Sequence, residues 1–281
     1  MTEQADLTRG PGLLYPLKAA HTRLRSLAWR ARGGAAPAEP GFRILFYHRV
    51  SDDRDELAVR PERFRAQLEI LAASGYRGVD VTTALDAAPG AVGLAFDDGY
   101  LDIAEHAVPE LERHGFTATV FLATGVTDGR VALSWYRTQP PILSWDDVGR
   151  LDGGALRFEA HTVTHPNLLA VGEQRAREEI AGSKRELEER LGREVPVFCY
   201  PAGLFGAREV ELVAEAGFRA ACTCEPGLNT PLTSRLQLHR IQVDARDSLL
   251  DFRAKLGGGF DRPSRARAMW RRARYDVSRR S

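Results

Sequence analysis

The chain has 281 residues, of which 43% are hydrophobic and 27% charged, and this composition excludes wholesale disorder, a fibrous repeat and a disulfide-stapled miniprotein. The length suits one large α/β domain. The sequence contains no apolar run of membrane-spanning length and no signal-peptide pattern, and its three cysteines are too few for a secreted disulfide framework. We therefore expect a cytoplasmic protein.

Charge is unevenly distributed around a net value of +1. Residues 1–41 carry six basic and three acidic residues, and residues 261–281 carry eight and two, which leaves −8 for 42–260. An acidic body argues against nucleic-acid binding, whereas the basic ends suit an anionic surface. A Gly/Pro/Ala linker at 33–41 also separates the N-terminal segment from the rest. We divide the chain into a basic segment with linker (1–41), a folded body (42–260) and a basic tail (261–281).

Periodicity predicts the elements in chain order. Leucines recur at helical spacing among basic residues within 13–28, which predicts an amphipathic helix that lies either in an anionic membrane interface or against the body. Beyond it, apolar runs of strand length alternate with helical patterns, as in βα units. The expected strands are 42–48, 77–81, 92–98, 117–123, 156–161, 195–201, 218–223 and 236–243, and the main helices are 61–75, 100–115, 173–192 and 207–217. This pattern predicts an α/β fold, a distorted or incomplete (β/α) barrel of seven to eight parallel strands, with function at the carboxyl ends of the strands.

Polar residues end several of these strands. His48, Asp97 with Asp98, and His161 each close an apolar run. Two adjacent carboxylates at the end of a buried strand repel each other and need a cation or a proton. His161 and His165, four residues apart, suit either a solvated helix face or, with a carboxylate from another strand, a three-ligand metal site. The combination favours a divalent metal site at this rim.

Four motifs in order resemble the polysaccharide deacetylase family, that is, carbohydrate esterase family four with the NodB homology domain. They are YHRV at 47–50, AFDDGY at 95–100, HTVTHPNL at 161–168 and FCYPAG at 198–203. The first resembles a branch with a circularly permuted barrel that includes poly-N-acetylglucosamine deacetylases. Over about 42–245, the resemblance implies a hydrolase that removes N-acetyl groups from an amino sugar in a polysaccharide, oligosaccharide or lipid-linked glycan.

Matched positions imply roles for individual residues. Asp97 would be the general base, beside a divalent ion, commonly zinc, that lowers the pKa of water. The implied metal ligands are Asp98, His161 and His165. The leaving amine also needs a proton, for which His48 on the same rim is our candidate and His239 the alternative.

The remaining candidates surround the third motif. A backbone N–H in the turn of Tyr200, Pro201 and Ala202 would stabilise an oxyanion. Most family members have Arg where this chain has Cys199, so the group that orients the base must come from elsewhere. Arg240, which we place with the substrate-binding residues, is the candidate.

Other residues keep two interpretations. Trp135, Tyr136 and Trp145 would stack on a sugar ring or pack in the core. Glu159 stands where the family usually has glycine, so the floor of the pocket is expected to differ. Cys222 and Cys224 form no complete metal motif, and we interpret them as structural.

Two alternative functions stay open. A protein of this fold could hydrolyse an O-acetyl ester or a non-sugar amide, because a fold does not fix its substrate. A non-catalytic glycan or metal binder is disfavoured, since a binder has no need of the Asp97 base. The expected partners are an acetylated glycan or lipid-linked sugar and, through the basic ends, a membrane surface.

Overall fold

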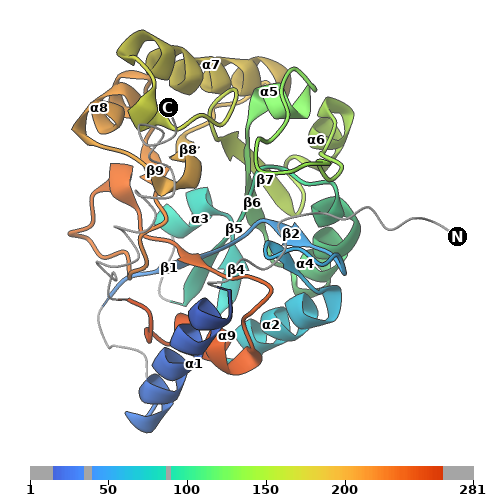
Figure 1. Ribbon diagram of the computed structural model, residues 1–281, viewed down its shortest axis with the longest axis vertical. Helices are drawn as coiled ribbons and strands as arrows, with labels where there is room; N and C mark the ends of the chain where they lie inside the picture. The colour runs from blue at the N-terminus through green and yellow to red at the C-terminus, as the bar shows by residue number, and fades with distance from the viewer. Residues whose placement is uncertain (1–14, 35–39, 87–89, 262–281) are drawn as a thin grey trace, which may run out of the picture.

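The computed structural model describes residues 15–34, 40–86 and 90–261 (Figure 1). The expected distorted barrel is confirmed. A parallel sheet curls into a half-barrel with the strand order β10-β1-β5-β6-β7-β8-β9. The strand β4 lies off this path and pairs with the first residues of β5, whereas β6 pairs with its last residues. All eight expected strands form. They are β1 (Arg43–Tyr47), β4 (Arg77–Val79), β5 (Ala91–Asp97), β6 (Ala118–Leu122), β7 (Leu156–Ala160), β8 (Val197–Cys199), β9 (Ala220–Cys222) and β10 (Ile241–Gln242).

Most helices cover the outside of the sheet, whereas α3 (Val81–Asp86) packs against its concave face through Val81 (Figure 1). In chain order after β1, the helices are α2 (Pro61–Ala73), α3, α4 (Val108–His114), α5 (Thr124–Thr127), α6 (Trp145–Leu151), α7 (Glu173–Leu191), α8 (Ala207–Glu215) and α9 (Leu249–Leu256). One turn of π-helix, Ile103–Ala107, precedes α4. Short 3₁₀ turns occupy Leu168–Ala170, Pro201–Gly203 and Arg235–Gln237, and β2 (Arg49–Val50) pairs with β3 (Ala58–Val59) as a separate small sheet.

Two large apolar clusters, and a third small one of Val79, Ala84 and Ala91, hold the described part of the fold together. The largest cluster, which includes Leu45, Phe96 and Val120, lies between the sheet and its helices. The second, which includes Phe46 and Phe121, is enclosed by the curled sheet. Side chains alternate between the two faces of a strand, so neighbours such as Leu45 and Phe46 enter different clusters. This alternation decides which polar side chains point into the barrel.

The N-terminal helix α1 (Tyr15–Ala31) packs on α9. The Trp29 indole N–H donates to the carbonyl of Gly257 at 3.0 Å, and Arg25 donates to the carbonyl of Gly259 at 3.0 Å. The structure therefore shows that one face of this helix packs against the body. The alternative, that the helix lies in a membrane interface, stays a prediction for its other face. Residues 1–14 and the tail 262–281 lie outside the described residues, so the expectations for them stay predictions. Within the described ranges, no helix is both long enough and apolar enough to cross a membrane.

Candidate active site

Backbone strain marks one end of the barrel. In the described part of the chain, the non-glycine residues with positive φ are Asp98, Thr162, His165 and Ala202, at 74°, 68°, 55° and 52°. Such conformations cost about 1 kcal/mol or more each and persist only where the surroundings enforce them. They lie in the segments that follow β5, β7 and β8, at the carboxyl ends of the strands. A functional site is expected at this rim.

Strand alternation directs Asp97 and His161 into the barrel. Ala95 belongs to the enclosed cluster, and Asp97, two residues later on β5, shares its face. The ring of His161, just after β7, lies 6.5 Å from the ring of Phe121 in the same cluster. The strained backbone then turns Asp98 toward the following loops, where a glycine must come next: a Cβ at Gly99 would lie 2.3 Å from Leu122. The geometry of this turn thus requires the glycine of the DDG sequence.

Asp98, His161 and His165 converge on one point. The Asp98 Oδ1 atom lies 3.7 Å from His161 Nε2 and 3.6 Å from His165 Nε2. These separations are too long for hydrogen bonds. Tetrahedral ligands held about 2.0–2.1 Å from a zinc ion would lie roughly 3.4 Å from one another. The three atoms therefore have the spacing of ligands around one ion.

The surroundings of the two histidines suit metal binding. Burial lowers the pKa of His161 to about 4 and lowers that of His165 well below its usual value, so both rings are neutral, the form that binds metals. The Nδ1 atom of His161 lies 2.7 Å from the carbonyl oxygen of Cys199, which fixes Nε2 as the atom facing Asp98. Tyr100 donates a hydrogen bond of 3.2 Å to the other oxygen of Asp98.

A second cluster, Asp97 with His161 and Cys199, also has ligand atoms close enough to share an ion. It fits less well, because Arg240 occupies it. The Arg240 guanidinium donates to Asp97 Oδ1 at 2.6 Å and to Oδ2 at 2.9 Å, and its Nη2 lies 3.0 Å from the Cys199 sulfur. A cation in that position repels a metal ion, so Asp98, His161 and His165 are the better ligand set.

Arg240 determines the state of Asp97. Burial alone would raise the pKa of Asp97, but the charge and hydrogen bonds of Arg240 lower it below its usual value. Arg240 itself is completely buried, and its guanidinium lies 4.1 Å from the centre of the Phe46 ring. Arg240 therefore orients the Asp97 carboxylate from the buried interior of the barrel, and not from the side open to a substrate. A fully buried side chain does not contact a substrate, so Arg240 acts as a positioning residue.

Glu179 on α7 holds the loop that carries the two histidines. Its Oε2 accepts hydrogen bonds from the backbone N–H groups of Val163 and Thr164 at 2.9 and 2.7 Å, and its Oε1 accepts from the Thr164 hydroxyl at 2.6 Å. Sequence reasoning missed Glu179 and Tyr100. A signal for Glu179 was present, because it shares the buried face of α7 with Ile180 and Ser183, where a carboxylate needs a partner.

The two histidine candidates for the general acid occupy different places. His48, half-buried between β1 and β2, lies close enough for its charge to act on the pKa values of Asp97 and His161, after the larger effects of burial. The pKa of His239 is lowered by burial, and the opposing charges near it are Glu225 and Asp261, outside the site. The structure therefore brings His48, but not His239, to the rim.

The turn after β8 contains the three residues predicted to offer a backbone donor. The Tyr200 N–H donates to the carbonyl of Cys222 at 3.1 Å within the sheet, and Pro201 has no N–H. Of the three residues expected to offer an N–H to an oxyanion, Ala202, whose φ is positive, is thus the remaining candidate. The Tyr200 ring stacks on Phe205 with centroids 4.7 Å apart, so it serves packing.

The three aromatic candidates have different neighbours. The Trp135 ring lies edge-on to His165, with centroids 4.7 Å apart, and so borders the site. Tyr136 donates to Asp55 at 2.6 Å. Trp145 on α6 packs against Arg190 of α7. Trp135 is therefore the aromatic candidate that lies directly against one of the converging histidines.

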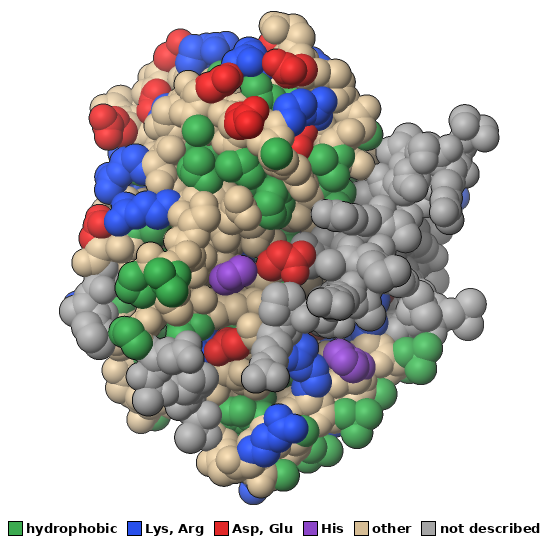
Figure 2. Space-filling view, turned by 90° about the vertical axis from the view of Figure 1, so that its left-hand side faces the viewer, with side chains coloured by type: hydrophobic (Ala, Val, Ile, Leu, Met, Phe, Trp, Pro, Cys, Tyr) green, Lys and Arg blue, Asp and Glu red, His purple; other side chains and the backbone are tan. Residues whose placement is uncertain are grey.

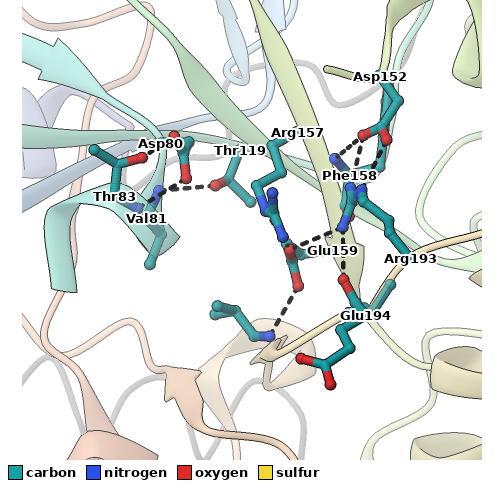
Figure 3. A network of polar contacts seen from close by, with 12 residues as sticks. Asp80, Val81, Thr83, Thr119, Asp152, Arg157, Phe158, Glu159, Arg193 and Glu194 are labelled. Carbon is teal, nitrogen blue, oxygen red and sulfur yellow. Dashed lines mark hydrogen bonds and ion pairs between the residues drawn. The ribbon is translucent and has the colours of Figure 1, made fainter. Parts of the chain in front are cut away.

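Glu159 on β7 is buried in a polar cluster with Arg157 and Arg193 (Figure 3). Its Oε1 accepts from Arg157 at 2.9 Å, its Oε2 accepts from the Val197 N–H at 2.8 Å, and Arg193 lies 3.5 Å away. Burial raises the pKa of Glu159 to about 7. The residue expected to change the floor of the pocket, Glu159, thus forms a polar cluster that links β7 to β8.

Comparisons with known proteins agree with this geometry. The profile of the family described as polysaccharide deacetylase matches residues 85–221. The curated protein YxkH of Bacillus subtilis (strain 168), whose description names the same family, is 26% identical over 207 residues, 71% of this chain and 70% of its own. The structure of IcaB from Ammonifex degensii superposes with a TM-score of 0.69 at 25% identity, over 79% of this chain and 99% of that one. Streptococcus pyogenes deacetylase PplD, in complex with acetate, gives a TM-score of 0.66 at 23% identity over 76% and 99% of the two chains, and shows a shared fold.

Proposed function

Since this chain belongs to the polysaccharide deacetylase family, we propose that it is a metal-dependent hydrolase that removes N-acetyl groups from an amino sugar in a polysaccharide, oligosaccharide or lipid-linked glycan. The observation that carries the proposal is the juxtaposition of an ionised, arginine-held Asp97 with the converging donor atoms of Asp98, His161 and His165. A non-catalytic binder would need the three donor atoms but not the oriented carboxylate.

The three donor residues would hold a divalent ion, with zinc the expectation from the family resemblance. When bound, such an ion polarises an acetyl carbonyl and lowers the pKa of water. The two neutral rings and one carboxylate leave positions open for water and substrate, the arrangement typical of catalytic rather than structural sites.

The chain's own residues supply the proton transfers. Arg240 keeps Asp97 ionised, so its carboxylate accepts a proton from the attacking water. The Ala202 N–H donates to the developing oxyanion. His48 donates a proton to the sugar nitrogen as the C–N bond breaks, leaving acetate and the free amine. Trp135 borders the space in which the acetylated sugar would lie.

Acetate release tests the proposal directly. The purified protein, loaded with zinc, is incubated with N-acetylglucosamine oligosaccharides and, separately, with O-acetylated glycans of similar length. We expect acetate from the N-acetyl substrates, no release after treatment with a chelator, and a loss of about 10²–10⁴ in rate for Asp97→Asn, because a positioned base is removed. Release from the O-acetyl substrates alone would replace N-deacetylation by ester hydrolysis, and full activity of Asp97→Asn would remove Asp97 from its role.

A further inference from the structure

Helix α1 packs on the body through a face that carries Trp29, Arg25 and two small polar residues, and it exposes a leucine-rich face. Thr22 and Ser26 are buried. Leu17, Leu24 and Leu27, by contrast, are 65%, 68% and 49% exposed. At 3.6 residues per turn, the exposed apolar positions fall within about 100° of the helix circumference. This surface, the leucine stripe, consists of Leu17, Ala20, Leu24, Leu27, Ala28 and Ala31.

Positive side chains border the leucine stripe on both sides. Helical spacing places Arg23 and Arg30 along one border and Lys18 along the other, and Arg32 follows the end of the helix. Arg25 lies beside Lys18, but its guanidinium is held by the body, through the carbonyl of Gly259 and the ring of Phe260. Residues 15–34 contain no Asp or Glu, so Asp251 of α9, which pairs with Arg23 at 3.3 Å, offsets only part of the charge. At the lower end of the molecule, where α1 lies in Figure 1, Figure 2 shows hydrophobic side chains beside Lys and Arg.

We infer that the leucine stripe docks on a membrane surface that contains anionic lipids. A helix that lies in the bilayer interface has this arrangement, with an apolar face that enters the acyl boundary and cations that meet the headgroups on either side. The body, residues 42–260, carries a charge of −8 and is repelled by the same surface, so the charge asymmetry would orient the protein with α1 toward the lipid.

Two other occupants match the stripe less well. A second copy would bring the cations that border one stripe against those that border the other, and like charges in contact oppose association. The tail 262–281 contains eight Arg and one Asp, so it carries the same sign of charge as α1. An anionic bilayer is the partner that complements both the leucines and the cations.

Vesicle sedimentation tests the inference with the full-length protein. We expect the protein to sediment with phosphatidylcholine vesicles that contain phosphatidylglycerol, to stay in solution with phosphatidylcholine alone, and to be released as salt screens the charges. The double variant Leu24→Gln with Leu27→Gln should weaken binding on the order of tenfold or more, because two leucines no longer enter the acyl boundary. Replacing Arg30 by Gln should weaken it about fivefold.

Matched variants separate the stripe from general surface effects. Leu232→Gln changes a leucine that is 96% exposed elsewhere, and Arg185→Gln changes an exposed arginine of α7, so neither should alter sedimentation. Thermal unfolding of each variant checks that the fold is retained. The inference is overturned if the double leucine variant sediments like the wild type, since charge alone would then bind the lipid. It is equally overturned if the wild type binds no vesicle; loss of a dimer in the double variant, measured by analytical ultracentrifugation, would then assign the stripe to a second copy.

Discussion

Replacing Arg240 by Met should lower both the free energy of unfolding and the rate of acetate release. The substitution keeps an unbranched apolar stem but removes the two hydrogen bonds, of 2.6 and 2.9 Å, that hold Asp97. The Asp97 carboxylate is 5% exposed and would remain buried without its cation. Removing one partner of a buried ion pair costs about 3–5 kcal/mol. For a domain of this size that corresponds to a fall in Tm of roughly 6–20 °C.

A double-mutant cycle isolates the pair. Asp97→Asn alone leaves the Arg240 charge buried, whereas the double variant Arg240→Met with Asp97→Asn buries neither charge. The double variant should therefore be less destabilised than the sum of the single changes, by about 2–3 kcal/mol. Urea unfolding monitored by tryptophan fluorescence measures all four free energies of unfolding. Additivity within about 0.5 kcal/mol would refute the view that these two groups stabilise each other.

A matched pair at the other end of β1 separates stability from catalysis. Arg43 donates two hydrogen bonds to Asp261, at 3.1 and 2.5 Å, far along the strand from the candidate site. Arg43→Met should lower the free energy of unfolding but leave acetate release per folded molecule unchanged. Arg240→Lys should keep the metal and much of the stability but lose activity. An ammonium group cannot form the bidentate pair of hydrogen bonds with which the guanidinium orients the carboxylate. Equal activity losses in the Arg43 and Arg240 variants would assign the effect to folding alone.

Three further predictions concern the metal loop and the proton donor. Glu179→Gln keeps one acceptor oxygen for the two backbone N–H groups but removes the negative charge and the second acceptor, which the Thr164 hydroxyl and Arg175 use. It should weaken zinc binding about tenfold in a chelator competition, whereas Glu178→Gln on the same helix should not. His161→Ala should lose stoichiometric zinc by elemental analysis while His239→Ala keeps it, and full zinc in the His161 variant would remove that ligand from the site. His48→Ala should slow acetate release more from amide than from ester substrates, because an amine leaves only after protonation; a larger defect in His239→Ala would reverse the assignment.

The strands and the place of the site could be predicted from the sequence because both follow from local patterns. Apolar runs ended by His48, Asp97 or His161 show where strands stop, and parallel strands bring their carboxyl ends to one rim. Elements without periodicity were not predictable in this way. Helices α3 and α5 are too short for a pattern, and the small sheet of β2 and β3 depends on Arg49, which is held by Asp55 and Asp102 at 3.0 and 2.8 Å from different segments.

The replacement for the missing arginine depended on tertiary structure. Arg240 and Asp97 are 143 positions apart, and they meet because β10 pairs with β1, which in turn pairs with β5. The thiol of Cys199 lies 3.0 Å from the same guanidinium, in the position where the family usually has arginine. A long side chain at 199 would occupy the space that Arg240 fills. The cysteine and the distant arginine are therefore complementary, and a Cys199→Arg variant should recover the oriented base only when Arg240 is shortened as well.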